Sequence, residues 1–129
     1  MNYTGVIIEE SLGDSAVLTK VKITETKVEP ITPEHKTPWL RQWTLRTVEI
    51  SEKDGGTIAE EISKSFDPKH PVWYADFKNE QFHFIIFNAK VFKIDLHHPI
   101  LYKAAKEYGI SIGIPEYQLD FFPEEKVWE

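Results

Sequence analysis

The chain has 129 residues, a length typical of one domain whose core is large enough to stand without disulfides or a structural metal. It contains no cysteine, which excludes disulfide frameworks, cysteine-ligated zinc, iron–sulfur clusters and thiol nucleophiles. Its formal net charge of −6 disfavours phosphate backbones and anionic lipid, so we expect neither nucleic acid nor a membrane as partner.

The remaining composition is that of a packed protein. Hydrophobic residues make up 41% and aromatic residues 13%, which supports a core rather than disorder. No apolar run approaches the roughly 20 residues needed to span a bilayer, and the first residues lack the pattern of a signal peptide. We therefore expect a single domain over residues 1–129 in the cytoplasm.

Three strands are predicted before the first helix. The apolar run Gly5–Glu9 is followed by turn residues at 12–14 and an alternating segment at 17–24, so these two strands are expected to form a hairpin. Three closely spaced prolines then mark a loop, because each restricts the residue before it to extended geometry. Residues Trp39–Ile50 are predicted to form a long strand, one face of which carries Trp39, Trp43, Leu45 and Thr47.

Two helices are predicted in the second half of the chain. Thr57 to Glu60 has the spacing of a capping box, and the helix that it starts is stopped by Asp67-Pro68. The second helix begins at Pro99 and ends at Gly109. Its predicted core-facing side carries Ile100, Leu101, Ala104, Ala105 and Tyr108.

Between the helices, Val72–Phe77, Gln81–Phe87 and Val91–Leu96 are predicted to form an antiparallel meander. The middle strand is apolar on both faces, which places it in the centre of the sheet and His83 in or near the core. After the second helix, residues 110–121 alternate again and are expected to form an edge strand or a segment that closes over the sheet.

The order of elements predicts an α+β fold: an antiparallel sheet of about six strands with two helices packed on one face. The alternative is a ferredoxin-like βαββαβ unit preceded by an N-terminal hairpin.

Three stretches of the chain are similar to a family of small bacterial and archaeal proteins of unknown function. The stretches that carry the similarity are His35-Lys36-Thr37-Pro38-Trp39, Val72 to Asp95 and Tyr108 to Phe121. The resemblance as a whole covers most of the chain. The pattern consists of aromatic, proline and glycine residues. The resemblance implies a compact free-standing domain and implies no activity, cofactor or partner.

The candidate catalytic residues are Asp76, His83, His35 and Glu116. Asp76 and His83 lie on neighbouring predicted strands, where a carboxylate and an imidazole form the minimal acid–base pair. If the hairpin turns at 78–80, Asp76 is expected to lie closer to Phe82 than to His83. The five histidines show no spacing typical of a metal site, and no glycine-rich phosphate loop is present, so no metal or cofactor is predicted.

The candidate binding residues are Trp39, Arg41 and Trp43, which follow the proline-rich loop, together with Trp73 and Tyr74. Tryptophan and arginine are enriched where proteins recognise partners. The first functional hypothesis is therefore a non-catalytic binding or interaction domain whose aromatic-rich surface takes a protein or a small ligand, with a homodimer as one arrangement. The second is a small hydrolase or isomerase that uses the acid–base candidates.

Overall fold

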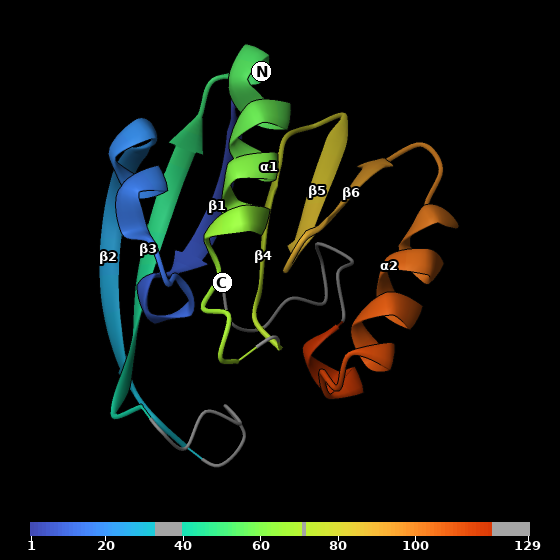
Figure 1. The fold of residues 1–129 in the computed structure, drawn as a ribbon. Helices are drawn as coiled ribbons and strands as arrows, with labels where there is room; N and C mark the ends of the chain where they lie inside the picture. Colours follow the sequence, from blue (N-terminus) through green and yellow to red (C-terminus); the bar gives the residue numbers. More distant parts are fainter. Residues whose placement is uncertain (33–39, 71, 120–129) are drawn as a thin grey trace.

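The computed structural model describes residues 1–32, 40–70 and 72–119, and Figure 1 shows their arrangement. They form an α+β fold around one six-stranded antiparallel sheet in the order β2-β3-β1-β4-β5-β6, which confirms the predicted fold class. The strands are β1 (Tyr3–Ile8), β2 (Lys22–Pro30), β3 (Gln42–Ile50), β4 (Tyr74–Lys78), β5 (Phe82–Phe87) and β6 (Lys90–Asp95). The helices are α1 (Gly55–Ser65) and α2 (Leu101–Ser111), with short 3-10 turns η1 (Glu9–Ser11), η2 (Ser15–Lys20), η4 (Glu52–Asp54) and η5 (Glu116–Gln118).

The predicted N-terminal hairpin is wrong. β1 pairs with β3 and β4, and β2 lies at the edge of the sheet with β3 as its neighbour. Residues 15–20 form η2 instead of a strand, and the Asp14 side chain accepts a hydrogen bond from the Ala16 amide at its start. Val17 and Leu18 are both buried although they are adjacent, which a strand does not allow because successive side chains point to opposite faces.

The two helices cover opposite faces of the sheet, which corrects the prediction that both pack on one face. Phe84 and Ile86 of β5 belong to the core that contains the buried side of α1, whereas Ile85 and Phe87 belong to the core that contains the buried side of α2. Since neighbouring residues of a strand point to opposite faces, a strand that is apolar on both faces needs cover on both. The ferredoxin-like alternative does not apply, because β3 pairs with β1 and β2 and with no other strand of the described residues.

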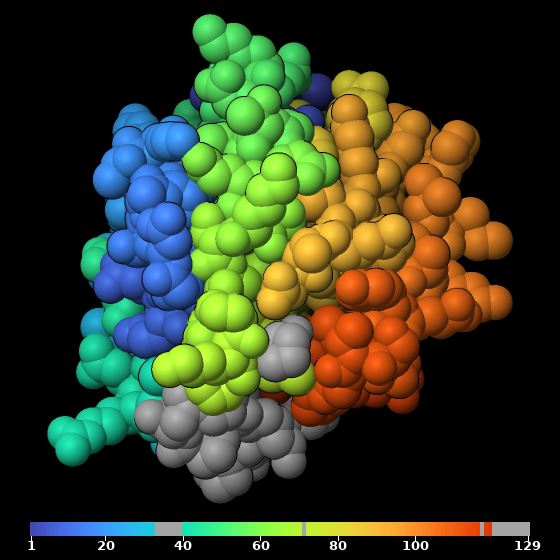
Figure 2. Space-filling model, viewed as in Figure 1, coloured from blue at the N-terminus to red at the C-terminus, as the bar shows by residue number. Residues whose placement is uncertain are grey.

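The middle of the sheet face under α1 is covered. Figure 2 shows the side chains of η2 and α1 packed side by side over it. α1 starts at Gly55, two residues before the predicted start at Thr57, and the ring of Tyr3 packs against this glycine. On the same face Tyr3 stacks edge-on against Phe77 and Phe84, each with ring centroids 5.3 Å apart.

Gly5 holds β1 against β4 in the middle of the sheet. A Cβ atom at this position would lie 2.1 Å from the carbonyl oxygen of Asp76 and 2.6 Å from the Cα of Phe77. Both are backbone atoms of the neighbouring strand, so a side chain would push the two strands apart. The close approach of β1 and β4 therefore requires glycine here.

The chain after α2 folds back onto that helix. The helix continues to Ser111, a turn follows with Gly113 at a φ of 97°, and η5 leads to Leu119, whose side chain is 1% exposed and packs against Gly109. The edge strand, one of the two alternatives predicted for 110–121, is therefore absent from 110–119, and the last two residues lie outside the described part. The other alternative, a segment that closes over the sheet, agrees with the burial of Ile114 and Leu119 in the core that contains Ile85 and Phe87 of β5. No helix within the described residues is long and apolar enough to cross a membrane.

Candidate functional site

The β4–β5 hairpin brings the predicted acid–base pair together. Asp76 is paired with Ile85 and Lys78 with His83, so Asp76 and His83 are diagonal neighbours on the same face. The distance from Nε2 of His83 to Oδ2 of Asp76 is 2.6 Å. The prediction that Asp76 lies nearer Phe82 is wrong, because Phe82 follows the alternation of β5 and points to the other face.

Tyr102 of α2 completes a buried polar network with these two residues. Its hydroxyl lies 2.7 Å from Nδ1 of His83, and the two rings meet edge-on with centroids 5.5 Å apart. With Asp76 ionised, Nε2 of His83 donates to the carboxylate and Nδ1 accepts from the hydroxyl of Tyr102. The network therefore links β4, β5 and α2 through one imidazole.

Sequence reasoning missed Tyr102 because it placed the core-facing side of α2 about one residue away: the predicted Ala105 and Tyr108 do pack in the core, but Tyr102 was left out. The buried positions of this helix are Tyr102, Ala105 and Gly109, whereas Ile100, Leu101 and Ala104 are exposed. The spacing 102, 105 and 109 is as helical as the predicted one. The available signal was the buried polar His83, which needs a hydrogen-bonding partner on whichever element covers it.

The network is enclosed by the fold. The exposed fraction is 1% for Asp76, 0% for His83 and 6% for Tyr102. A substrate atom needs to come within hydrogen-bond distance of a general acid or base, and side chains this deeply covered do not offer that access. The network is instead suited to fixing the position of α2 on the sheet, because the hydrogen bond between His83 and Tyr102 is lost if the helix shifts.

The predicted aromatic binding residues contribute mainly to packing. Trp73 is 4% exposed, and Trp43 is half-buried against it with ring centroids 5.6 Å apart. Tyr74 is half-buried, and its hydroxyl donates to the carbonyl oxygen of Gln118. Arg41 is exposed.

The other predicted residues are spread out or outside the described part. Glu116 is exposed at the far end of α2 and forms an ion pair with Lys106 at 3.3 Å. Trp39 and His35 lie outside the described residues. Within residues 1–32, 40–70 and 72–119, no group of three histidine, aspartate or glutamate side chains is placed to hold a metal ion.

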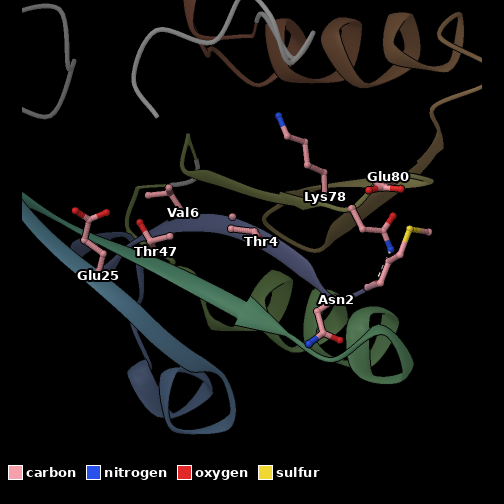
Figure 3. A pocket seen from close by; sticks show the side chains of 10 residues that line it. Asn2, Thr4, Val6, Glu25, Thr47, Lys78 and Glu80 are labelled. Atoms are coloured by element: carbon pink, nitrogen blue, oxygen red, sulfur yellow. Dashed lines mark hydrogen bonds between the residues drawn. The ribbon is translucent and has the colours of Figure 1, made fainter.

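Within the described residues, the face of the sheet that carries His83 is covered only in part. α2 packs over β4, β5 and β6, whereas Thr4, Val6, Glu25 and Thr47 on the same face of β1, β2 and β3 are partly or fully exposed. Ile8 and Leu45, which are paired with each other at one end of that face, are buried. Figure 3 shows this open face, where Thr4, Val6 and Thr47 rise from the sheet on the side opposite α1. We call the surface formed by Thr4, Val6, Glu25, Thr47 and Lys78 the open face.

The open face is hollowed where it approaches α2. The hollow has a volume of about 660 Å³ and is lined by Met1, Asn2, Thr4, Gly5, Val6, Glu25, Thr47, Lys78, Asn79 and Glu80. Lys78 stands on the side of the hollow towards α2 (Figure 3), and Val6 is paired with Asp76 of the buried network. The hollow thus lies next to the network, with hydroxyl and amide groups on its floor and charges of both signs at its rim.

Sequence reasoning did not find the open face. Its residues come from four strands, and none belongs to a motif. Their common feature is that they lie on the sheet face that α2 leaves uncovered. That feature depends on the order of the strands and on the side that each helix takes.

Comparisons with known proteins found no match: no family model, no curated protein and no solved structure is similar enough to this chain to report. The resemblance stated from the sequence therefore stays a prediction.

Proposed function

We propose that the protein is a non-catalytic interaction domain that recognises a folded protein partner through its open face. The observation that carries the proposal is a sheet face that the described residues cover only in part: α2 packs over β4, β5 and β6, whereas Thr4, Val6, Glu25 and Thr47 on the same face remain partly or fully exposed. A sheet face left open beside a covered region offers a rigid surface on which side chains from several strands are held in register.

The shape of the hollow favours a macromolecular partner over a small ligand. Sites for small molecules usually bury 70–90% or more of the ligand surface. The hollow is open above the sheet, and its walls are the side chains of Lys78 and Glu80 on one side and Glu25 on the other. A broad convex surface can contact its whole floor, whereas a small molecule would remain largely in water.

The predicted aromatic residues lie beyond one end of this surface. Trp43, Leu45 and Thr47 alternate along β3 on the same side, and the buried Leu45 separates the half-buried Trp43 from the hollow. Arg41 is exposed two residues before Trp43. A partner that covers the open face and extends past Leu45 would reach one tryptophan and one arginine, residue types that dominate binding energy at interfaces.

The acid–base candidates do not support a catalytic function. The second functional hypothesis needs an accessible acid–base pair, and Asp76 and His83 are both buried. The exposed Glu116 forms its ion pair on α2, away from them.

The proposal is tested with a substitution that fills the hollow. We expect Thr47→Arg to weaken binding of the partner by at least about tenfold, because a long side chain on the floor prevents close contact. Thr57→Arg is the matched control, since Thr57 is exposed on α1 and belongs to the opposite, covered side of the sheet.

The measurement has two steps. Proteins retained by the immobilised chain are identified by mass spectrometry, and each one is then purified and titrated by calorimetry against the wild type and both variants. A partner that loses affinity for the Thr47 variant alone supports the proposal. Equal affinity of all partners for the three proteins, or a loss confined to the Thr57 variant, contradicts it.

A further inference from the structure

The second unpartnered feature of the sheet is the outer edge of β2. β2 has nine residues, pairs only with β3, and is the edge of the sheet formed by the described residues. All its residues are exposed except Glu29, and Ile23 and Val28 are 40% and 52% exposed. A long exposed edge strand presents a row of backbone donors and acceptors to any extended segment that fits.

Two charged side chains select the segment that fits. Glu25 is paired with Thr47 and Lys27 with Leu45, so Glu25 and Lys27 project from the same face of β2. Glu25 forms no ion pair with any described residue, whereas Lys27 has an exposed ammonium that lies 3.7 Å from Glu29. A strand that places a lysine opposite Glu25 and a glutamate opposite Lys27 is complementary to this edge, and β2 itself is such a strand.

We propose that two copies of the chain pair antiparallel through their β2 edges, with Thr26 at the two-fold axis. In this register Glu25 of each copy lies opposite Lys27 of the other, which makes two opposite-charge cross-strand pairs. Opposite charges directly across an antiparallel pair are stabilising, and like charges there are destabilising. The exposed Val28 then lies beside Thr24 of the second copy, and the two six-stranded sheets become continuous.

Neighbouring registers are less favourable. Centring the pair on Glu25 sets two glutamates opposite each other, and centring it on Lys27 sets two lysines opposite each other. Centring it on Val28 pairs Lys27 with Glu29, which already contacts Lys27 of its own chain and whose side chain is only 26% exposed. The register centred on Thr26 is the one that gives the unpaired Glu25 a partner.

The dimer would place the two open faces on the same side of the joined sheet. A two-fold axis perpendicular to the sheet keeps each face on its own side, so the hollows of both copies would point in one direction. This inference does not depend on the proposed function, because its test measures the molecular mass of the protein in solution and not the binding of another protein.

The test uses two charge reversals that complement each other. Glu25→Lys gives a chain with lysine at both positions, and Lys27→Glu gives a chain with glutamate at both. Each variant alone sets like charges across the dyad twice, and we expect its dimer dissociation constant to rise by about tenfold or more. An equimolar mixture restores both opposite-charge pairs, so it should form heterodimers with an affinity near that of the wild type.

The measurement is sedimentation equilibrium from micromolar to millimolar concentration at low salt, for the wild type, each variant and their mixture. Lys103→Glu is the control, since Lys103 is exposed on α2 and its reversal changes the net charge as Lys27→Glu does. Circular dichroism checks that the variants are folded. A wild type that stays at 15.1 kDa throughout, or a mixture that associates no better than its components, overturns the proposal.

Discussion

Removal of the Tyr102 hydroxyl tests whether the buried network holds α2 on the sheet. Tyr102→Phe keeps the ring that packs at 5.5 Å from His83 but removes the group that lies 2.7 Å from Nδ1. Loss of one hydrogen bond in a buried site, with the partner atom left without it, costs about 1–2 kcal/mol. For a chain of this length that corresponds to a fall in Tm of roughly 4–8 °C.

The matched control is Tyr108→Phe. Tyr108 lies on the same helix and packs on Phe87 with ring centroids 5.1 Å apart, and its hydroxyl makes no hydrogen bond with the described residues. The same chemical change should therefore alter the unfolding free energy by less than about 0.5 kcal/mol. Urea unfolding followed by tryptophan fluorescence measures both variants.

A double-mutant cycle separates the hydrogen bond from other effects of the substitution. In a His83→Leu background the hydroxyl of Tyr102 has lost this acceptor, so Tyr102→Phe should be neutral or stabilising, with a coupling energy of about 1–2 kcal/mol. Equal costs for the Tyr102 and Tyr108 variants would refute the reasoning. So would a cost for Tyr102→Phe that persists unchanged when His83 is replaced.

Three further predictions concern packing and pH. Gly5→Ala should cost about 3 kcal/mol or more, because its Cβ would meet the backbone of β4, whereas Gly56→Ala in open space on α1 should stabilise by about 0.5–1 kcal/mol; equal denaturation midpoints would contradict this. Leu119→Ala should cost about 2–5 kcal/mol by opening a cavity against α2, and a change within about 0.5 kcal/mol would show that this segment is not docked. The hydrogen bond from His70 holds the pKa of Asp67 below its usual value, so its stabilising contribution is present above the unfolded pKa of about 3.9 and is lost as the pH falls through the lower folded pKa. Asp67→Asn should therefore flatten the acid side of the stability curve, and an unchanged pH dependence would exclude this contribution.

Much of the local structure follows from short-range patterns. Alternation over residues 72–96 predicted the meander of β4, β5 and β6, and the apolar character of β5 on both faces placed it inside the sheet. The α1 helix ends close to the predicted stop before Asp67-Pro68. These features depend on neighbours a few residues apart, whose types report backbone geometry directly.

The sequence pattern gave a wrong prediction where two local structures or two helix faces fit it equally well. Residues 17–20 alternate as a strand would, yet Val17 and Leu18 are buried together in a 3-10 turn against α1. At the start of α2 the sequence offers two apolar residues, Ile100 and Leu101, for the core-facing side. Both are exposed, and the side that carries Tyr102 faces the sheet. In both cases tertiary packing selected one of two locally acceptable faces.

The amino-acid sequence by itself determined the α+β class, the central meander and the presence of two helices, because periodicity is a local property of the chain. Only the tertiary structure decided that β2 pairs with β3, that the helices take opposite faces, and that Tyr102 meets His83. These are contacts between segments far apart in the chain, and periodicity does not encode which segments meet. The open face results from those long-range choices, which is why no motif marks it.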